Sequence, residues 1–295
     1  MNPTGYFLGS GPAELERLRL QATIYEEHTR WLLDRIPIQP GWRALDVACG
    51  PVGIVPLLAE RVGPTGEVMG LDSDAGMVEN ARALVVDQGL TSTQIVVGDA
   101  RRTGFPSSGF DLVHERLLLI NVPDPESVLA EMIRLTRPGG FVVAQEVDTV
   151  SWLCEPPHPA WDRLLDAWKI IGSELGKDLF IGRRLPALLE GVGLVEVGTR
   201  VHALVYRGNH PYKMHLLWFI ALGRDRILEK GLFAPAELAE LVEGLRRHLE
   251  QPGTLVLAHL LFQAWGRRSL ASPPGMAAPR DTQNPASRRP VKTGQ

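Results

Sequence analysis

Residues 45–53 read Leu-Asp-Val-Ala-Cys-Gly-Pro-Val-Gly, a short apolar run that ends in a turn of small residues. Apolar residues then recur at helical spacing from Ile54 to Val62. The pattern predicts a buried strand, a tight turn and a helix. Small residues let the backbone of such a turn pass close to a ligand, with the first N–H groups of the helix facing it. A ligand-binding turn is therefore indicated, although many nucleotide-binding folds share one, and so do plain strand–helix turns.

The same alternation continues on both sides of this turn. Strands are predicted at residues 44–48, 67–71, 94–97, 110–114, 141–146, 195–205 and 255–265. Helices are predicted at residues 14–35, 54–62 and 124–135, with another through Met77, Val78 and Ala81. Strands that alternate with helices across short loops are typical of an α/β fold with helices on both faces. We therefore predict a doubly wound, Rossmann-like, mostly parallel seven-stranded sheet.

The second half of the chain adds a helical cap. Helical patterns occupy residues 161–175, 185–189, 212–228 and 235–249, between and beside the late strands. Helices inserted there are expected over the carboxyl edge of the sheet, as cap elements around 150–190 and 210–250. We predict a flexible N-terminus at 1–13, one domain at 14–270 and a disordered tail at 271–295. The tail has five prolines and no aromatic residue, too little apolar surface to offset its ordering entropy.

Composition excludes several classes of protein. The chain has 295 residues, a net charge of −3 and a pI near 6.3, which argues against nucleic-acid binding. Its two cysteines, Cys49 and Cys154, form no disulfide or zinc pattern, and the eight histidines show no metal spacing. We predict no metal. The sequence lacks a signal-peptide pattern and an apolar run long enough to span a membrane, which favours a cytoplasmic protein.

Acidic residues stand at the ends of two further strands. Asp72 follows the second strand, where a carboxylate can accept hydrogen bonds from both hydroxyls of a ribose. Asp99 follows the third strand, where an acid can hold an adenine amino group. Residues 137–140 read Arg-Pro-Gly-Gly and predict a turn before the next strand. Taken together, these positions indicate an adenosine-containing ligand.

With these motifs the chain resembles the class I S-adenosylmethionine-dependent methyltransferases. It is most similar to the branch that contains ubiquinone/menaquinone C-methyltransferases and many bacterial natural-product methyltransferases. The matching stretch runs from about Arg43 to Asp148, and a looser resemblance continues through residues 182–185, 191–194 and 264–267. The resemblance implies S-adenosyl-L-methionine as the cofactor.

Residue by residue, the resemblance implies the following cofactor contacts. The methionine part would meet Asp46, Ala48 and Gly50, with Gln21 and Tyr25 of the first helix closing over its carboxylate. The ribose would meet Asp72, Ser73 and Met77, and the adenine would meet Asp99 and Ala100. After the fourth strand, Glu115 and Arg116 would face cofactor and substrate, with plain surface exposure as the alternative for Glu115.

Two positions depart from the family pattern. Ala48 stands where the family often has glycine, and Val52 stands where a glycine is usual, directly before Gly53. Residues 48–53 also approach the Gly-x-Gly-x-x-Gly pattern of NAD-binding proteins. Asp99 and the 137–140 turn weigh against NAD.

Methyl transfer depends mainly on holding the acceptor in line and excluding water, so a catalytic triad is not required. Candidates for a base or an orienting group are His114, Glu146 and Asp148, which lie at strand ends. The alternatives are a histidine packed beside the sheet, and acids that cap helices or form salt bridges. Asn121 is a further candidate, or else a loop cap before Pro123.

The predicted cap is rich in aromatic rings and histidines, namely His158, Trp161, Trp168, Tyr212, His215, Trp218 and Phe219. Such a lid suits an apolar or aromatic acceptor, although aromatic residues at helical spacing are also typical of a packed core.

These inferences predict an enzyme that transfers a methyl group to a carbon, oxygen or nitrogen of a small molecule, in secondary metabolism or quinone-like biosynthesis. One alternative is a non-catalytic S-adenosylmethionine-binding or scaffold protein, because no general base is evident. Another is a protein or nucleic-acid methyltransferase, which would be expected to carry Asn-Pro-Pro-Tyr where residues 114–117 read His-Glu-Arg-Leu. A homodimer is compatible with the sequence.

Overall fold

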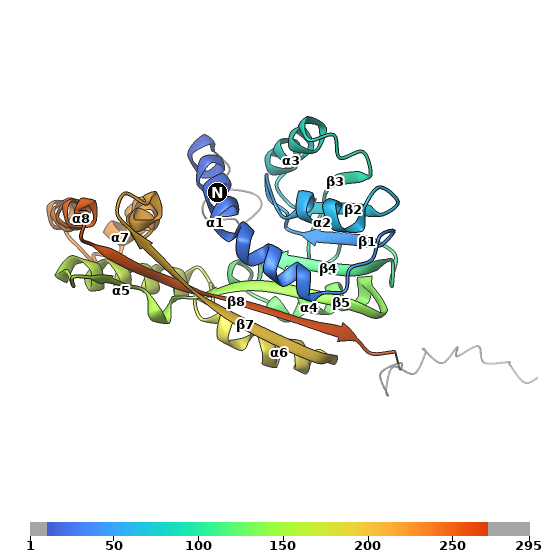
Figure 1. The fold of residues 1–295 in the computed structure, drawn as a ribbon. Coiled ribbons are helices and arrows are strands. Elements are labelled where there is room, and N and C mark those ends of the chain that lie inside the picture. Colours follow the sequence, from blue (N-terminus) through green and yellow to red (C-terminus); the bar gives the residue numbers. More distant parts are fainter. Residues whose placement is uncertain (1–10, 271–295) are drawn as a thin grey trace, which may run out of the picture.

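The computed structural model describes residues 11–270, which form one central sheet with helices on both faces (Figure 1). The strands are β1 (Arg43–Val47), β2 (Glu67–Asp72), β3 (Thr93–Val97), β4 (Phe110–Arg116), β5 (Thr136–Asp148), β6 (Leu153–Glu155), β7 (Leu194–Arg207) and β8 (Leu255–Arg268). The helices are α1 (Pro12–Arg35), α2 (Val55–Val62), α3 (Ala75–Asp87), α4 (Pro125–Leu135), α5 (Pro159–Glu174), α6 (Leu185–Gly191), α7 (His215–Glu229) and α8 (Pro235–Glu250). Short 3-10 turns are η1 (Leu119–Asn121), η2 (Thr149–Ser151), η3 (Ile181–Arg184) and η4 (Pro211–Met214).

The strand order confirms the predicted fold class. Neighbouring strands follow the order β3-β2-β1-β4-β5-β8, and the first five of these are parallel. β8 runs antiparallel to β5 and pairs with β7 on its other side. The sheet has eight strands rather than the predicted seven, because the short β6 also pairs with β8. Three residues are too few for a periodic signal in the sequence.

Each face of the sheet is covered by its own helices. On one face, α1, α2 and α3 bury residues such as Leu33, Leu58 and Val78 against the sheet. On the other face, α4 and α6 bury residues such as Met132 and Leu189. Buried apolar residues on both faces explain why the central strands are nearly continuous apolar runs.

The cap helices form a third hydrophobic cluster beside the sheet. α5, α7 and α8 pack around residues such as Trp161, Leu216 and Leu245, next to one end of the antiparallel pair β7–β8 (Figure 1). β7 and β8 pair from Leu194–Arg268 to Arg207–Leu255, and α7 and α8 lie between them in the chain. This pair of strands therefore belongs to both the sheet and the cap, and it fixes the cap relative to the carboxyl ends of the parallel strands.

Two predicted boundaries differ from the structure. Residues 137–140, predicted as a turn, lie inside β5, and the pairing with β4 shifts register between Phe110 and Leu112. The Pro-Gly-Gly sequence makes an irregularity within the strand here, because β4 pairs with β5 both before it, at Thr136, and after it, at Phe141. α1 begins at Pro12, a favoured first helical residue, and so includes the end of the segment predicted to be flexible. The tail predicted at 271–295 lies outside the described residues.

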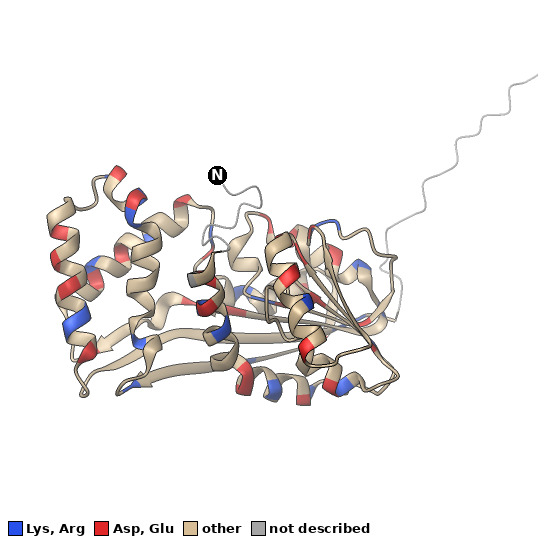
Figure 2. Cartoon of the chain, turned by 90° about the horizontal axis from the view of Figure 1, so that it is seen from above, with Lys and Arg blue, Asp and Glu red and all other residues tan. Residues whose placement is uncertain are grey.

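The molecular surface shows both signs of charge. In Figure 2 acidic and basic residues are interspersed along the outer sides of the helices. None of the helices described between residues 11 and 270 combines the length and the apolar character needed to cross a membrane.

Candidate functional site

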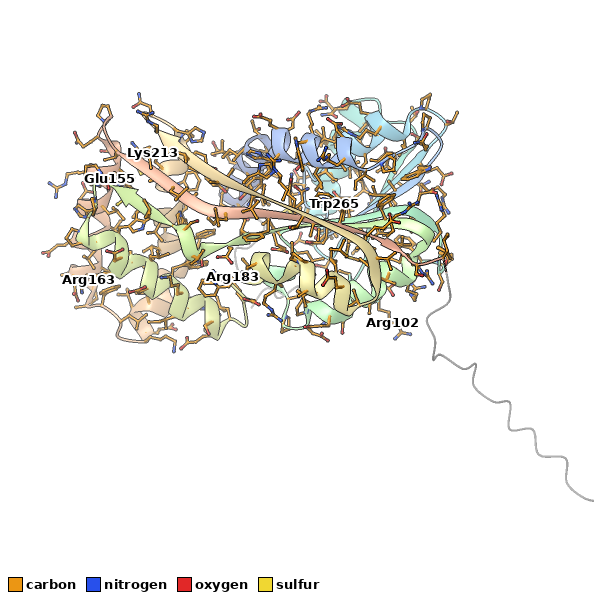
Figure 3. All side chains as sticks on the ribbon, turned by 60° about the horizontal axis from the view of Figure 1, so that its bottom comes forward. Arg102, Glu155, Arg163, Arg183, Lys213 and Trp265 are labelled. Carbon is orange, nitrogen blue, oxygen red and sulfur yellow. The ribbon has the colours of Figure 1, made fainter. Side chains whose placement is uncertain are left out.

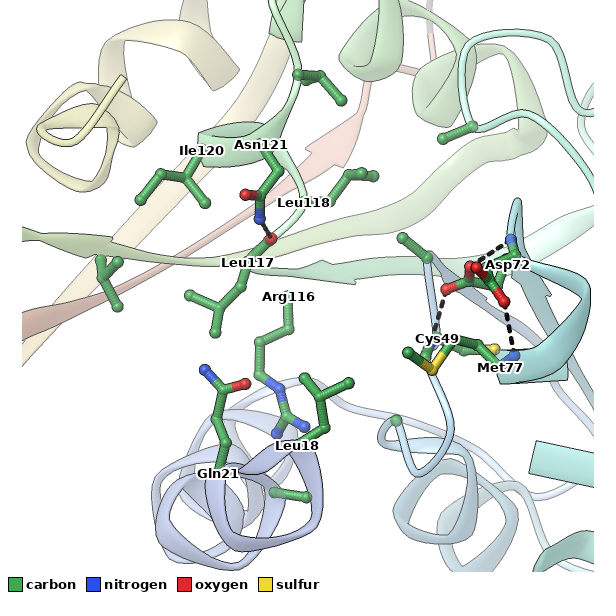
Figure 4. Close-up of a pocket in the computed structure, with 18 of the residues that line it drawn as sticks. Leu18, Gln21, Cys49, Asp72, Met77, Arg116, Leu117, Leu118, Ile120 and Asn121 are labelled. Atoms are coloured by element: carbon green, nitrogen blue, oxygen red, sulfur yellow. Dashed lines mark hydrogen bonds between the residues drawn. The ribbon is translucent and has the colours of Figure 1, made fainter. Parts of the chain in front are cut away.

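A cavity of about 690 Å³ lies at the carboxyl ends of the parallel strands, between the sheet, α1 and the cap. Ligands of open α/β sheets bind at this edge. Eleven of the predicted site residues line the cavity, namely Gln21, Tyr25, Asp46, Ala48, Gly50, Asp72, Ser73, Met77, Asp99, Ala100 and Arg116. Figure 4 shows part of this wall, with Asp72 and Met77 on one side and Arg116 and Gln21 on the other.

The turn after β1 exposes its backbone to the cavity. Ala48, Gly50 and Gly53 have φ angles of 54°, 59° and 53°, in the left-handed region. A side chain added at Gly50 would meet no atom within 4 Å, so the backbone borders open space there. At Gly53 an added Cβ would lie 2.6 Å from Asp46 Oδ2. The Gly53 position is therefore closed by the acid that precedes it, while Gly50 lies open to a ligand.

Asp46 is held in place by a buried polar network. Its Oδ2 accepts the Ile54 N–H at 3.0 Å, and its Oδ1 lies 2.8 Å from His114 Nδ1. Gln145 Oε1 accepts hydrogen bonds from Thr29 and Gln263, so its amide nitrogen donates to His114 Nε2 at 2.8 Å. His114 therefore carries its proton on Nδ1 and donates it to Asp46. Burial lowers the pKa of His114, which keeps the ring neutral.

This network places His114 under the cavity rather than on its wall. The ring is fully buried and does not line the cavity. His114 orients Asp46. Its buried position agrees with the alternative interpretation of the sequence, a histidine packed beside the sheet. Through Thr29 and Gln145 the same network ties α1 to the sheet, and Trp31 of α1 meets Trp265 edge-on.

The two predicted adenosine-binding acids lie along the cavity with different partners. Asp72 Oδ2 accepts the Gly50 N–H at 2.8 Å, and its Oδ1 accepts the Asp74 N–H at 2.9 Å. Burial raises the pKa of Asp72. Asp99 is about half exposed and forms an ion pair with Arg101, which lowers its pKa. Asp72 is thus fixed between two backbone turns, whereas Asp99 is held only by its neighbour.

Glu115 and Glu146 form a buried carboxyl pair beneath η1, outside the cavity wall. Glu115 Oε2 accepts the Leu118 N–H at 3.1 Å, and Glu146 Oε1 accepts the Ile120 N–H at 3.2 Å. The other oxygens, Glu115 Oε1 and Glu146 Oε2, receive no hydrogen bond from another group. Burial raises the pKa of Glu146 to about 8 and that of Glu115 well above its usual value. Burial and the proximity of a second acid both favour the protonated form, so we expect Glu146 to hold a proton at neutral pH.

We expect the free energy of unfolding of Glu146→Gln to fall less steeply between pH 6.5 and 8 than that of the unaltered protein. A carboxyl with a raised folded pKa keeps its proton in the folded state and loses it on unfolding. Its stabilisation is therefore full below pH 4.5 and falls as the pH rises to about 8, by about 1.4 kcal/mol per pH unit for one proton. Buried histidines with lowered pKa values contribute little above pH 6.5. Urea unfolding at several pH values measures the slope.

The control for this experiment is Glu79→Gln, which removes an exposed carboxyl on α3. It should keep the slope of the unaltered protein. An unchanged slope in Glu146→Gln would show that Glu146 holds no extra proton in the folded state.

Asp148, the third predicted catalytic candidate, contacts other parts of the chain and not the cavity. Its carboxylate forms an ion pair with Arg183 and accepts the Val150 N–H at 2.9 Å. The side chain is fully buried and does not line the cavity. Arg183 lies on η3, next to the sheet (Figure 3). Asp148 thus combines the capping and salt-bridging roles that were the alternative to a substrate contact.

Arg116 brings a cation to the cavity between β4 and α1 (Figure 4). Its Nη1 donates to Thr29 at 3.3 Å, and its guanidinium lies 5.8 Å from the Tyr25 ring centre. No carboxylate among the described residues forms an ion pair with it. Burial lowers its pKa, although arginine stays charged at neutral pH. The wall therefore offers a half-buried positive group to an anion.

The cap closes the far side of the cavity with aromatic rings and histidines. Of the aromatic cap residues, Trp168, His215 and Phe219 line the cavity. The rings of Trp168 and Phe219 stack at 4.5 Å. The others pack elsewhere; Trp161, for example, is in the cap core and His158 caps α5. Asn121 also reaches the wall, where its side chain donates to Leu117 O and accepts from Lys177.

Sequence reasoning missed Trp152 and His259, which also line the cavity. His259 Nε2 lies 2.6 Å from the Tyr25 hydroxyl. A polar signal was present, because His259 and Gln263 are spaced by four residues within the apolar run of β8 and so share one face of the strand. Arg17 and Lys177 likewise line the cavity. Within residues 11–270 no group of three or more histidine, cysteine or acidic side chains is placed to hold a metal ion.

Comparison with known proteins agrees with the fold and with the family resemblance. Residues 45–144 match the family model described as a methyltransferase domain, which confirms the resemblance indicated by the motifs. A demethylmenaquinone methyltransferase of Geobacillus kaustophilus is 42% identical over 125 residues, which are 41% of this chain and 53% of the relative. One from Listeria monocytogenes is 33% identical over 147 residues, 49% of this chain and 60% of the relative. The chain thus spans about half the length of the curated relatives it matches.

Solved structures share the fold. The YcgJ protein of Bacillus subtilis has a TM-score of 0.54 at 17% identity, covering 82% of this chain and 99% of its own. Phosphoethanolamine N-methyltransferase 2 of Haemonchus contortus, solved with S-adenosyl-L-methionine, has a TM-score of 0.54 at 17% identity, covering 85% and 56%. At these identities the likeness shows the Rossmann-like methyltransferase fold.

Proposed function

We propose that this chain, whose residues 45–144 match a methyltransferase domain, is an enzyme that transfers a methyl group from S-adenosyl-L-methionine to a small molecule. The observation that carries the proposal is the order of the wall residues along one cavity. Asp46 and the open Gly50 backbone lie at the end of β1, Asp72 at the end of β2 and Asp99 after β3. These groups suit an amino acid, a ribose and an adenine in that order.

The residues on the wall fit this cofactor chemically. Asp72 would accept the ribose hydroxyls, with Ser73 and Met77 beside it, and Asp99 and Ala100 would hold the adenine. The bare backbone at Gly50 leaves the space that a side chain would fill.

The amino-acid end of the cofactor would lie toward α1. The half-buried Arg116 suits its carboxylate, and Gln21 and Tyr25 line the same wall from α1. Asp46, oriented by His114, would face the positively charged amino group. Glu115 supports this wall from beneath, because its carboxyl receives the Leu118 N–H and so fixes the turn after Arg116.

The chemistry places modest demands on the protein. When bound, S-adenosyl-L-methionine supplies a methyl group already activated on a sulfonium. The chain has to orient the acceptor and exclude water. The turn after β1 and α1 would close over the cofactor, and the cap rings would close over the acceptor. Asp46 stays in place because His114 donates to it.

The acceptor that we propose is a small molecule of secondary metabolism or quinone-like biosynthesis. The demethylmenaquinone methyltransferases among the relatives and the apolar cap support this class. Charges of both signs are interspersed on the helices seen in Figure 2, which favours a small acceptor over a nucleic acid. A cytoplasmic location and a homodimer complete the proposal.

We expect micromolar binding of S-adenosyl-L-methionine and S-adenosylhomocysteine in calorimetric titration, and no binding of NAD. With an acceptor library, formation of S-adenosylhomocysteine should follow and should persist in a chelator. Binding of NAD alone would refute the function. Cofactor binding with no turnover across the library would favour a scaffold protein.

A further inference from the structure

β7 forms a long open edge of the sheet. Within residues 11–270 it pairs with β8 alone, so its other side carries backbone N–H and C=O groups that no described strand pairs. Residues 198–207 are a regular stretch of this edge, because the register shift between Ala203 and Val205 adds its extra residue to β8. Open strand edges pair readily with other strands, so proteins usually protect them with charges, prolines or bulges.

The centre of this edge has none of these protections. A register shift near Glu196, whose φ is 53°, interrupts the start of the strand, and Arg207 ends it. Residues 201–205 read Val-His-Ala-Leu-Val, without a proline, an acidic residue, a lysine or an arginine. Val201 and Val205 are 42% and 50% exposed. A regular apolar edge of this kind is expected to be covered by another strand.

The exposed apolar residues of the edge share one face of the sheet. The guanidinium of Arg200 lies 4.6 Å from the ring centre of Trp31, so Arg200 turns toward α1. Successive residues of a strand point to opposite faces. Val201, Ala203 and Val205 therefore lie on the face away from α1, and all three are exposed.

A second cavity, of about 350 Å³, borders the same edge. It is lined by residues 203–206 of β7, by Ile24 and His28 of α1 and by His210. Four consecutive residues of a strand line one cavity only where the cavity lies at the strand edge, since their side chains alternate between the two faces. The edge is therefore accessible between α1 and the turn after β7.

The sequence of β7 is complementary to a second copy of itself. A two-fold axis through Ala203 would pair residues 199–207 of the two copies antiparallel along their whole length. Val201 would then lie opposite Val205 of the second copy, on the same face, and Ala203 would lie opposite Ala203. Each arginine of the stretch would face an uncharged residue. Such a self-complementary patch is what a two-fold dimer requires.

The C-terminal segment of the same chain suits this edge less well. Leu194 pairs with Arg268, so the chain leaves the described part beside the start of β7. Residues 271–295, however, contain five prolines, and proline cannot donate a hydrogen bond to a strand ladder. Residues 194–207 contain none. The edge therefore favours a second β7 over this segment.

We propose that β7 is the interface of a homodimer, in which the β7 strands of two copies pair antiparallel around Ala203 and join the two sheets into one. The inference goes beyond the proposed function, because this edge lies outside the cavity at the parallel strands and the dimer is measured without the cofactor. Its backbone hydrogen bonds would provide affinity, and the valine and alanine contacts would set the register.

Ala203→Lys tests the interface, because it would place two like charges face to face on the axis. The unaltered protein should sediment as a dimer at micromolar concentration. In the variant the Kd of the dimer should rise by about tenfold or more. Val195→Lys is the matched control, since Val195 is 44% exposed on the same strand but lies outside the paired stretch. This control should stay dimeric.

A charge exchange makes the result independent of misfolding. Ala203→Glu alone should also be monomeric at concentrations where the unaltered protein is dimeric. An equimolar mixture of Ala203→Lys and Ala203→Glu should recover the dimer, because opposite charges would then meet on the axis. Two misfolded variants would not recover on mixing.

Cysteine variants test the register. The native Cys49 and Cys154 are buried and unpaired. Ala203→Cys should form a disulfide with a second copy on mild oxidation, because facing Cα atoms of antiparallel strands lie within disulfide range. Val201→Cys should cross-link with Val205→Cys in a mixture, and neither should cross-link efficiently with itself.

Two outcomes would overturn the proposal. One is an unaltered protein that stays monomeric at the highest concentration sedimented, and the other is a dimer that persists in Ala203→Lys with no cross-link in Ala203→Cys. Binding of S-adenosylhomocysteine is measured separately by calorimetry on the same samples. A monomer that binds it refutes the interface alone, and a dimer that does not bind it refutes the proposed function alone.

Discussion

Asp72→Ala is expected to weaken the binding of S-adenosyl-L-methionine by about 10- to 150-fold. Hydrogen bonds to a charged group are worth about 1.5–3 kcal/mol, and the variant removes those to the ribose hydroxyls. It also leaves the N–H groups of Gly50 and Asp74 without their acceptor, so the turn that borders the ligand loosens. Calorimetric titration of the variant with S-adenosyl-L-methionine and S-adenosylhomocysteine measures the loss.

Two further variants make this result specific. Asp72→Asn keeps the shape of the side chain and one acceptor oxygen, so its affinity should fall between those of Asp72→Ala and the unaltered protein. Asp87→Ala removes an exposed carboxylate at the end of α3 and should bind the cofactor normally. Full affinity in Asp72→Ala would mean that the ribose lies elsewhere.

The fold could be predicted from the sequence because the apolar patterns that indicate its strands and helices are local. The apolar runs of β1, β2 and β4 and the helical spacing of α4 each fall within a few turns of chain, and the structure has them within one or two residues. The irregularity in β5 could not be predicted, because Arg-Pro-Gly-Gly is a turn signal unless a neighbouring strand provides partners. β6 depends in the same way on β8.

The candidate site likewise has a part that the sequence predicts and a part that it does not. Its cofactor half follows one rule, since residues after successive parallel strands meet at one edge, and Asp46, Asp72 and Asp99 do so. The acids at the ends of β4 and β5 do not follow it, since Glu115 and Glu146 turn toward each other below η1. Which way such a side chain turns depends on the packing of η1, and spacing in the sequence does not encode that.

The acceptor half was the least accessible part. His259 lies on the last strand and meets Tyr25 of the first helix, 234 residues away. A contact of this range depends on the strand order and on the cap together. The composition of the cap indicated an aromatic lid, but only the structure separates the rings on the wall, such as Trp168, from those in the core, such as Trp161.

Gly53→Ala is expected to lower the free energy of unfolding by about 2–5 kcal/mol, from overpacking and a left-handed backbone together. The new Cβ would lie 2.6 Å from Asp46 Oδ2 and 2.7 Å from the Cys49 carbonyl oxygen. Neither atom can move away, because His114 and the Ile54 N–H hold Asp46, and the Cys49 oxygen is backbone. Urea denaturation measures the loss.

Gly50→Ala separates the crowding from the backbone conformation. Its φ of 59° is close to the 53° of Gly53, but its Cβ would meet nothing within 4 Å. Ala48, at 54°, already shows that this turn holds an alanine in the left-handed region. Gly50→Ala should therefore lower the free energy of unfolding by about 1 kcal/mol or less, because a stiffer unfolded chain offsets part of the strain.

The methyl group of Gly50→Ala would instead enter the space assigned to the cofactor, so the variant should fold and bind S-adenosyl-L-methionine weakly. Equal stability losses in the two variants would show that conformation rather than crowding controls the turn, and undiminished binding by Gly50→Ala would move the cofactor away from it.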